Sequence, residues 1–136
     1  MPPITKELVL DSWAVIAFFE DEPAGKKIAD LIANAHEDGI PVNMTVVNVG
    51  EVWYITAREI SEEAANNIVK ELSDLRIEFV NVNWEITQEA ARFKSKSRMS
   101  YADCYAAALT RSKKGVLVTG DSEFKTIDGQ IDIQWV

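Results

Sequence analysis

Four acidic residues lie next to or within apolar segments, where an unpaired charge is unfavourable. Asp11 and Asp121 each follow a short apolar run, and Glu51 and Asp103 each lie inside a nearly all-apolar stretch. A carboxylate in apolar surroundings loses hydration and must find a partner or a metal ion. Four such groups brought together would repel one another, and a divalent cation would relieve that repulsion. Oxygen ligands suit Mg²⁺ or Mn²⁺, and such a site activates water and stabilises charge on a phosphoryl group.

Each of these acids also has a simpler structural interpretation. Asp11 could cap the helix that follows it, and Asp121 could be a turn residue. Glu51 could be a buried acid paired with Arg58, and Asp103 could lie on the polar side of its helix. The four alternatives are separately credible, but their joint occurrence is less so, and the pattern favours a metal site.

The scarcity of cysteine and histidine excludes much other chemistry. Cys104 is the only cysteine and His36 the only histidine, so neither an internal disulfide nor a zinc site built from several such ligands can form. His36 lies in a polar helix-end stretch and is expected at the surface. If the protein is an enzyme, carboxylates must carry its chemistry.

Positive charge is concentrated in one segment of an acidic chain. The net charge is −8, yet residues 92–114 hold seven of the 14 Lys and Arg residues and a single acid, Asp103. Cations that bracket a metal site are where a polyanionic backbone would lie. Lys94, Lys96 and Arg98 are therefore candidate residues for binding such a backbone, and the alternative is that they form only a solvated helix end and loop.

The predicted elements alternate between short buried strands and helices. We expect strands at 8–10, 40–44, 77–82, 116–119 and 131–135, and helices at 12–19, 46–58, 61–72, 85–95 and 100–112. A further helix is expected to open at Asp21, Glu22 and Pro23 and to stop near Gly39. This order predicts an α/β domain with a mostly parallel sheet of four to five strands flanked by helices. Ligands of such folds bind beyond the carboxyl ends of the strands, where Asp11 and Asp121 are expected.

Length and composition indicate one domain, residues 1–136, with a true hydrophobic core. The longest apolar stretch, residues 13–19, falls far short of the roughly 20 residues that a membrane-spanning helix needs. Residues 1–7 lack the pattern of an export signal. A cytoplasmic protein without a membrane partner is expected.

Four segments resemble PIN domains, and VapC-type toxins in particular, over essentially the whole chain. They are LVLDS at residues 8–12, VGEV at 49–52, MSYADCYAAA at 99–108 and VLVTGDSEF at 116–124. Each segment alone is weak evidence for the family, but the order and spacing of the four segments together are fairly specific for it. Trp13 departs from the family, because many members carry a small or polar residue at this position. The strongly acidic remainder of the chain is also less expected of an RNA-binding enzyme.

The resemblance implies a three-layer PIN-like fold and an Mg²⁺- or Mn²⁺-dependent endoribonuclease of the two-metal type. It implies in-line attack by metal-activated water on an RNA phosphodiester, leaving a 5′-phosphate and a 3′-hydroxyl. It further implies a homodimer, silenced by an antitoxin whose tail enters the active site. The implied metal ligands are Asp11, Glu51, Asp103 and Asp121, with Ser12 and Thr119 as polar neighbours that orient them.

Other functions compete with a toxin of a toxin–antitoxin pair. A PIN-like nuclease of RNA processing would need no antitoxin, and a PIN-like module could bind RNA or protein without cutting. Catalytic loss normally shows as missing acids, and all four are present here. A haloacid-dehalogenase-type phosphatase would need an aspartate two residues after Asp11, where this chain has Trp13.

Overall fold

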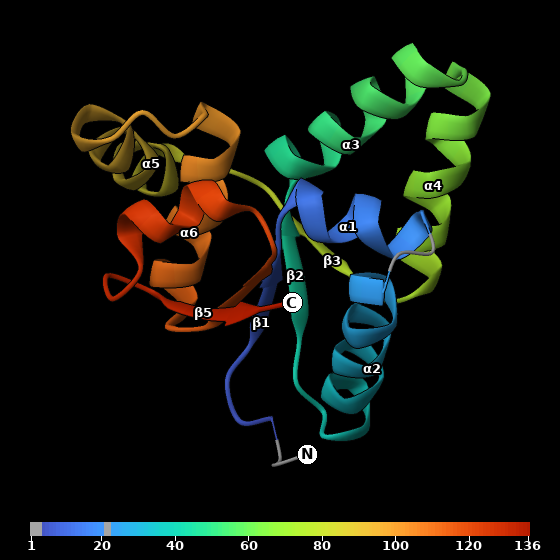
Figure 1. The fold of residues 1–136 in the computed structure, drawn as a ribbon, viewed down its shortest axis with the longest axis horizontal. Helices are drawn as coiled ribbons and strands as arrows, with labels where there is room; N and C mark the ends of the chain where they lie inside the picture. The colour runs from blue at the N-terminus through green and yellow to red at the C-terminus, as the bar shows by residue number, and fades with distance from the viewer. Residues whose placement is uncertain (1–3, 21–22) are drawn as a thin grey trace.

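The computed structural model describes residues 4–20 and 23–136, which form a parallel β-sheet covered by helices on both sides (Figure 1). The strands are β1 (Leu8–Leu10), β2 (Val42–Thr45), β3 (Glu78–Val80), β4 (Val116–Thr119) and β5 (Asp132–Trp135). The helices are α1 (Ser12–Phe19), α2 (Pro23–Glu37), α3 (Val46–Glu59), α4 (Glu62–Asp74), α5 (Trp84–Lys96) and α6 (Tyr101–Lys113), with a short 3₁₀ helix, η1 (Ser122–Ile127).

The order of the strands determines where a ligand can enter. It is β3-β2-β1-β4-β5, and every pairing is parallel. The chain moves outward from β1 to β3 and then returns to the other side of β1 with β4. The order therefore reverses between β1 and β4, and the crevice beyond the carboxyl ends of these two strands is the usual binding place in an open parallel sheet.

The two faces of the sheet pack against different helices, which gives three layers. Leu8 and Leu10 point into a core shared with α1, α2 and parts of α3 and α4. Val9, between them, points into a second core shared with α5, α6 and η1. Alternate residues of a strand face opposite sides, so the apolar run of β1 fills both cores. Figure 1 shows α5 and α6 on one side of the sheet and α1 to α4 on the other.

The structure confirms the predicted fold class, a mostly parallel sheet flanked by helices, and shows all five strands parallel. The strands predicted at 8–10 and 116–119 and the helix predicted at 12–19 have the bounds expected, and the remaining element ends differ by at most two residues. Asp21 and Glu22, predicted to open a helix, lie outside the described residues. The second helix ends at Glu37, and Gly39 adopts a positive φ of 71° beyond it. Within residues 4–20 and 23–136, no helix is both long and apolar enough to cross a membrane.

Candidate metal centre

Asp11 lies fully buried where β1 meets α1 and makes two hydrogen bonds. Its Oδ1 accepts from the backbone N–H of Ala14 at 2.8 Å, so this side chain does cap α1. Its Oδ2 accepts from the hydroxyl of Thr119 at 2.6 Å. Leu10 pairs with Val118 in the sheet, and this register brings the next residues of both strands together. The helix cap and the strand-end contact therefore coexist, and capping does not remove Asp11 from the crevice.

Asp121 is held against Asp11 through the turn that follows β4. The Thr119 hydroxyl accepts from the backbone N–H of Asp121 at 3.0 Å while it donates to Asp11. Asp121 in turn caps η1 by accepting from the backbone N–H of Glu123 at 2.9 Å. One threonine thus links the two strand-end aspartates.

Trp13 packs on this same turn. A Cβ added at Gly120 would lie 2.2 Å from the Cη2 atom of the Trp13 ring, so only a glycine fits beside the ring. Gly120 is the residue between Thr119 and Asp121. The ring that departs from the family pattern thereby braces the turn that carries two site residues.

Asp103 enters the site from the first turn of α6. Its side chain is buried, with 5% of the residue exposed. Ser100 caps α6 by accepting from the backbone N–H of Asp103 at 3.1 Å, which fixes the start of the helix. Carboxylate oxygens of Asp103, Asp121 and Glu123 lie within 4.8 Å of one another. Glu123 was not predicted as a ligand from the sequence, and η1 brings it to the site.

Glu51 joins the site from the middle of α3. Its Oε1 accepts a hydrogen bond from the hydroxyl of Ser12, the residue next to Asp11. Arg58 packs over the ring of Tyr54 at 5.3 Å from the centroid, so the predicted alternative of a Glu51–Arg58 pair does not describe this arrangement. We call the five acids of this region the acidic cluster; they are Asp11, Glu51, Asp103, Asp121 and Glu123.

Helix starts surround the acidic cluster. Asn48, capped by Thr45 at the beginning of α3, donates from its side chain to the carbonyl of Ala102 in α6 at 3.1 Å. This bond joins the first turns of two helices that cover opposite faces of the sheet. The N-termini of α1, α3 and α6 therefore stand at the carboxyl edge of the sheet. Helix N-termini carry partial positive charge and favour anions such as phosphate.

The acidic cluster is electrostatically strained in the absence of a cation. Burial, with the charges of Asp121 and Glu51, raises the pKa of Asp11 from 3.8 to about 7, against the opposing hydrogen bonds from Thr119 and Ala14. Burial and a hydrogen bond with Glu123 raise the pKa of Asp103 from 3.8 to about 8, with the charges of Asp121 and Asp11 adding to the rise. Both carboxyls therefore hold their protons to a higher pH than an ordinary aspartate, and a positive charge in the site would oppose this.

This donor set fits a hard divalent cation. All of its side-chain ligands are carboxylate oxygens, and Mg²⁺ and Mn²⁺ prefer oxygen. Asp103, Asp121 and Glu123 have carboxylate oxygens close enough together to hold one such ion, and Asp11 and Glu51 lie beside this group. A divalent ion would replace the protons that Asp11 and Asp103 retain.

The family model for the PIN domain matches residues 8–130 of the sequence. The chain belongs to the PIN-domain family. No curated protein matches the sequence significantly.

Solved structures share the fold of this PIN domain at low sequence identity. VapC20 of Mycobacterium tuberculosis, a sarcin-ricin loop cleaving toxin, is 15% identical with a TM-score of 0.71, covering 88% of this chain and 94% of that one. VapBC of Salmonella typhimurium bound to DNA is 15% identical with a TM-score of 0.73, covering 96% and 98%. FitAcB of Neisseria gonorrhoeae is 21% identical with a TM-score of 0.65, covering 93% and 95%.

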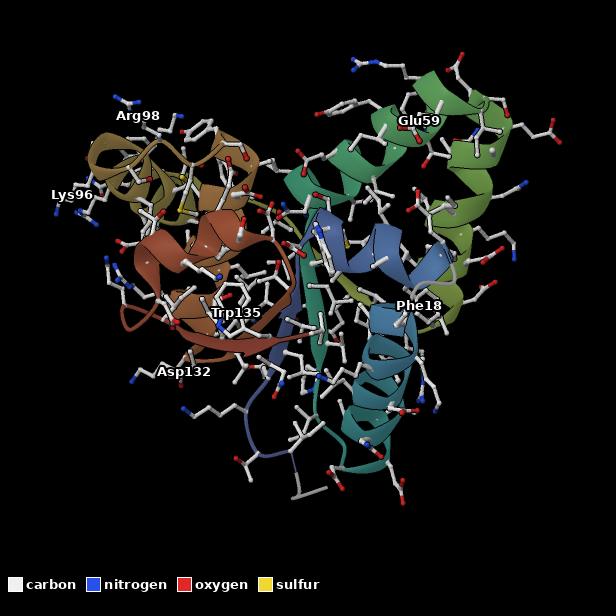
Figure 2. All side chains as sticks on the ribbon, viewed as in Figure 1. Phe18, Glu59, Lys96, Arg98, Asp132 and Trp135 are labelled. Carbon is white, nitrogen blue, oxygen red and sulfur yellow. The ribbon has the colours of Figure 1, made fainter. Side chains whose placement is uncertain are left out.

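The candidate RNA-binding cations of this PIN domain lie at the end of α5 and in the loop that follows it. Figure 2 shows Lys96 and Arg98 at the outer end of α5 and in the loop after it, pointing away from the sheet. Lys94 donates to the carbonyl of Met99 at 2.7 Å and so closes the same loop. Two other basic residues of the segment, Arg92 and Arg111, bind Glu89. Arg92 and Arg111 are thus engaged within the chain, whereas Lys96 and Arg98 point outward.

Proposed function

We propose that the protein is a metal-dependent endoribonuclease that hydrolyses RNA phosphodiesters at the acidic cluster. The proposal rests on one observation. Carboxylates that follow β1 and β4 meet carboxylates of α3 and α6 beyond the carboxyl ends of the strands, where the strand order reverses. Membership of the PIN-domain family supports it, because PIN domains are nucleases that use divalent metal ions.

Asp11, Glu51, Asp103 and Asp121 are the proposed metal ligands and catalytic residues. Bound Mg²⁺ or Mn²⁺ supplies an activated water and neutralises the charge that develops on the phosphoryl group. Thr119 holds Asp11 in place through its hydroxyl, and Ser12 holds Glu51. The starts of α1, α3 and α6 present backbone N–H groups to the same region and favour the approach of a phosphate.

Lys94, Lys96 and Arg98 are proposed to guide the RNA backbone toward this edge. Lys96 and Arg98 are exposed and point outward, so their contacts would be with phosphates remote from the cut and independent of sequence. Their charge contrasts with the net charge of −8 of the whole chain. The substrate responds to the local field, so the acidic total is compatible with an RNA substrate.

We further propose that this ribonuclease is the toxin of a toxin–antitoxin pair and works as a homodimer. The shared fold with VapC20 and with the VapBC complexes supports this assignment. The expected partner is a small DNA-binding protein that is encoded by a neighbouring gene and binds this chain. If expression alone does not arrest growth, or if no neighbouring product relieves the arrest, a role in RNA processing without an antitoxin replaces the toxin.

The nuclease is tested by cleavage of labelled single-stranded and structured RNAs with Mg²⁺, Mn²⁺ or EDTA. Wild-type protein is expected to cut with either metal and not with EDTA. Asp11→Asn and Asp103→Asn should lose at least 100-fold in rate, a magnitude typical of removing one electrostatic stabiliser. Asp30→Asn is the matched control, because Asp30 is an exposed residue of α2 that pairs with Lys26.

Two results would contradict the nuclease. Wild-type rates from Asp11→Asn would remove this residue from the reaction. Folded wild-type protein that binds Mn²⁺ but cuts no RNA of the panel would favour a binding module without catalysis.

A further inference from the structure

A small hollow of about 100 Å³ lies between the last two turns of α5, the end of α6 and the end of η1. Three cations line it, Arg92, Lys96 and Arg111, and none of the described residues that line it is acidic. No member of the acidic cluster borders it. We call this feature the basic hollow, and the chemistry assigned to the acidic cluster does not use it.

Glu89 holds the two arginines of the basic hollow in fixed positions. Its Oε1 accepts from Arg111 at 2.5 Å, and its Oε2 accepts from Arg92 at 2.7 Å. The Arg111 guanidinium also lies over the Phe93 ring, 4.5 Å from its centroid. Because a guanidinium carries five N–H donors, each arginine keeps donors that these contacts do not use. One carboxylate therefore positions two guanidinium groups without neutralising both of them.

Lys96 and Thr126 add donors to the basic hollow that the chain itself does not use. Both residues are exposed. Among residues 4–20 and 23–136, no carboxylate pairs with Lys96 and the Thr126 hydroxyl makes no side-chain hydrogen bond. Three cations against one carboxylate leave a net positive charge, and the planar fork of arginine matches the oxygens of a phosphate. The donor set therefore suits a phosphate group.

A second hollow, of about 220 Å³, continues this positive surface. Arg111 and Gln130 line both hollows, so the two adjoin. The second one adds Lys6 and Lys114, and the one acid among the described residues that line it, Asp132, pairs with Lys6. Figure 2 labels Lys96 in the first hollow and Asp132 in the second. Cations in succession match the repeated phosphates of a nucleic-acid backbone better than they match a single anion.

The 3₁₀ helix η1 connects the basic hollow with the acidic cluster. Asp121 caps the start of η1, and Thr126, near the end of η1, lines the hollow. A 3₁₀ helix rises roughly 2 Å per residue, so the backbones of these two residues lie about 10 Å apart along η1. A short stretch of RNA backbone spans such a distance.

We propose that the basic hollow is a phosphate-binding subsite and that a backbone phosphate of bound RNA occupies it. The affinity for phosphate stands on the hollow alone, whereas its RNA occupant rests on the proposed ribonuclease function. Phosphate contacts fix the register and orientation of a nucleic acid without reading its bases. A subsite on one side of the acidic cluster therefore sets the direction in which the strand crosses that cluster.

The first test adds inorganic phosphate to the protein in EDTA, so that no metal-dependent step contributes. The backbone amide signals of Lys96, Arg111 and Thr126 in nuclear magnetic resonance spectra should shift and saturate. Sodium chloride at equal ionic strength should not shift them. Arg92→Gln with Lys96→Gln leaves Glu89 bound to Arg111 and should weaken phosphate binding by roughly tenfold or more, because charged hydrogen bonds are lost.

A second variant tests the hollow without removing a cation. Thr126→Glu places a carboxylate in the hollow and should weaken phosphate binding to a similar degree. The matched control is Lys27→Gln with Arg58→Gln, which removes the same charge as the double variant from exposed positions on α2 and α3. The control should bind phosphate as the wild type does.

The RNA arm measures binding of a fluorescein-labelled 12-nucleotide RNA in EDTA by fluorescence anisotropy. Arg92→Gln with Lys96→Gln should lower RNA affinity by roughly tenfold, and the control pair should lower it less. Arg92→Lys keeps the charge and loses the planar fork, so its affinity should lie between those of the wild type and the double variant.

Two outcomes would overturn the subsite or its occupant. Amide shifts that sodium chloride reproduces, or that persist unchanged in the double variant and in Thr126→Glu, would overturn the subsite. Phosphate binding that the variants weaken, with RNA affinity unchanged, would support the subsite but assign it to free phosphate and overturn RNA as its occupant. Phosphate and RNA binding as expected, in a protein that cuts no RNA with Mg²⁺ or Mn²⁺, would support the subsite and contradict the nuclease alone.

Discussion

Asp11 performs two tasks that compete for its charge. As the cap of α1 it accepts from Ala14, and as a site residue it accepts from Thr119, yet burial still raises its pKa to about 7. Two hydrogen bonds are therefore insufficient to replace the hydration that this carboxylate loses. The protein carries this cost at the position where a divalent ion would relieve it.

The pKa of Asp11 predicts how stability depends on pH in EDTA. A carboxyl with a raised pKa in the folded state stabilises the fold while it is protonated, and this contribution is lost as pH rises from about 4 through about 7. Asp11→Asn keeps the acceptor for Ala14 and removes the charge. We expect the variant to exceed the wild type in free energy of unfolding at pH 8.5 by up to about 4 kcal/mol, and by little at pH 4.

Urea denaturation at both pH values measures this difference, with Asp30→Asn as the control on the surface. Added Mn²⁺ should stabilise the wild type at pH 8.5 and have little effect on Asp11→Asn. If Asp11→Asn raises the free energy of unfolding by the same amount at pH 4 and at pH 8.5, the charge of Asp11 is not the destabilising factor.

The contact of Trp13 with Gly120 predicts a non-additive pair of substitutions. Gly120→Ala should displace the turn that carries Asp121, because its Cβ would overlap the Trp13 ring, and overpacking of this kind costs about 1–3 kcal/mol. Trp13→Ala opens the space, so Gly120→Ala in that background should cost much less. Thermal unfolding and Mn²⁺ affinity by electron paramagnetic resonance measure both effects. Additive losses in the double variant would mean that the ring does not hold the turn.

Among the elements, those with a strong apolar signal could be predicted from sequence. The run of residues 116–119 is apolar and bounded by Gly115 and Gly120, and its strand has the predicted bounds. The 3₁₀ helix η1 was not predicted, because six mixed residues carry no helical period. Glu123 was missed as a site residue for the same reason, since only η1 turns it toward Asp103.

The acids that end apolar strands were the predictable part of the site. Asp11 and Asp121 follow β1 and β4, and a parallel sheet delivers such residues to one edge. The linkage between them could not be read from sequence, because it depends on the register that sets Thr119 beside Asp11. The outward placement of Lys96 and Arg98 also depends on the direction of α5, which composition does not specify.

Helices α5 and α6 are joined by one acid that binds two arginines. Glu89 accepts from Arg111 and from Arg92, and Arg111 also lies over the Phe93 ring at 4.5 Å from its centroid. The bond with Arg111 holds the pKa of Glu89 below its usual range. A lowered pKa contributes stability above the ordinary value near 4.5 and loses it as pH falls further.

Glu89→Gln should therefore lower the melting temperature at pH 7 and change it less at pH 3.5. The cost should be about 1 kcal/mol or less, because the pair is partly exposed and screened. Differential scanning calorimetry at the two pH values measures it, and Glu85→Gln, at an exposed acid of the same helix, is the control. A larger effect at pH 3.5 than at pH 7 would contradict the pairing.

At the scale of the whole molecule, positive and negative charges are segregated along the chain. Residues outside 92–114 carry a net charge of −14, and that segment carries +6. Long-range repulsion from the acidic remainder would keep RNA away from most of the surface. RNA affinity should then fall steeply as the salt concentration rises, and it should depend on a few basic residues.

Replacing Lys94, Lys96 and Arg98 together by Gln should weaken RNA binding and flatten its salt dependence. For a single strand, each lost phosphate contact lowers the slope of log K against log salt by about 0.7, so three contacts lower it by about 2. Fluorescence anisotropy from low to moderate salt measures the slope. Replacement of Lys26, Lys27 and Lys70, exposed on α2 and α4, is the matched control. An unchanged slope in the first variant would make its residues ordinary surface.

The hydrogen bond between Thr119 and Asp11 joins residues 108 positions apart in the chain. During synthesis, β1 and α1 leave the ribosome long before β4 exists, and N-terminal segments begin to fold first. Until β4 inserts beside β1, Asp11 has no Thr119, and Asp121 has no place in the crevice. The growing polypeptide consequently lacks the assembled acidic cluster while most of its message is being read, and the order of translation itself would delay the appearance of the proposed nuclease activity.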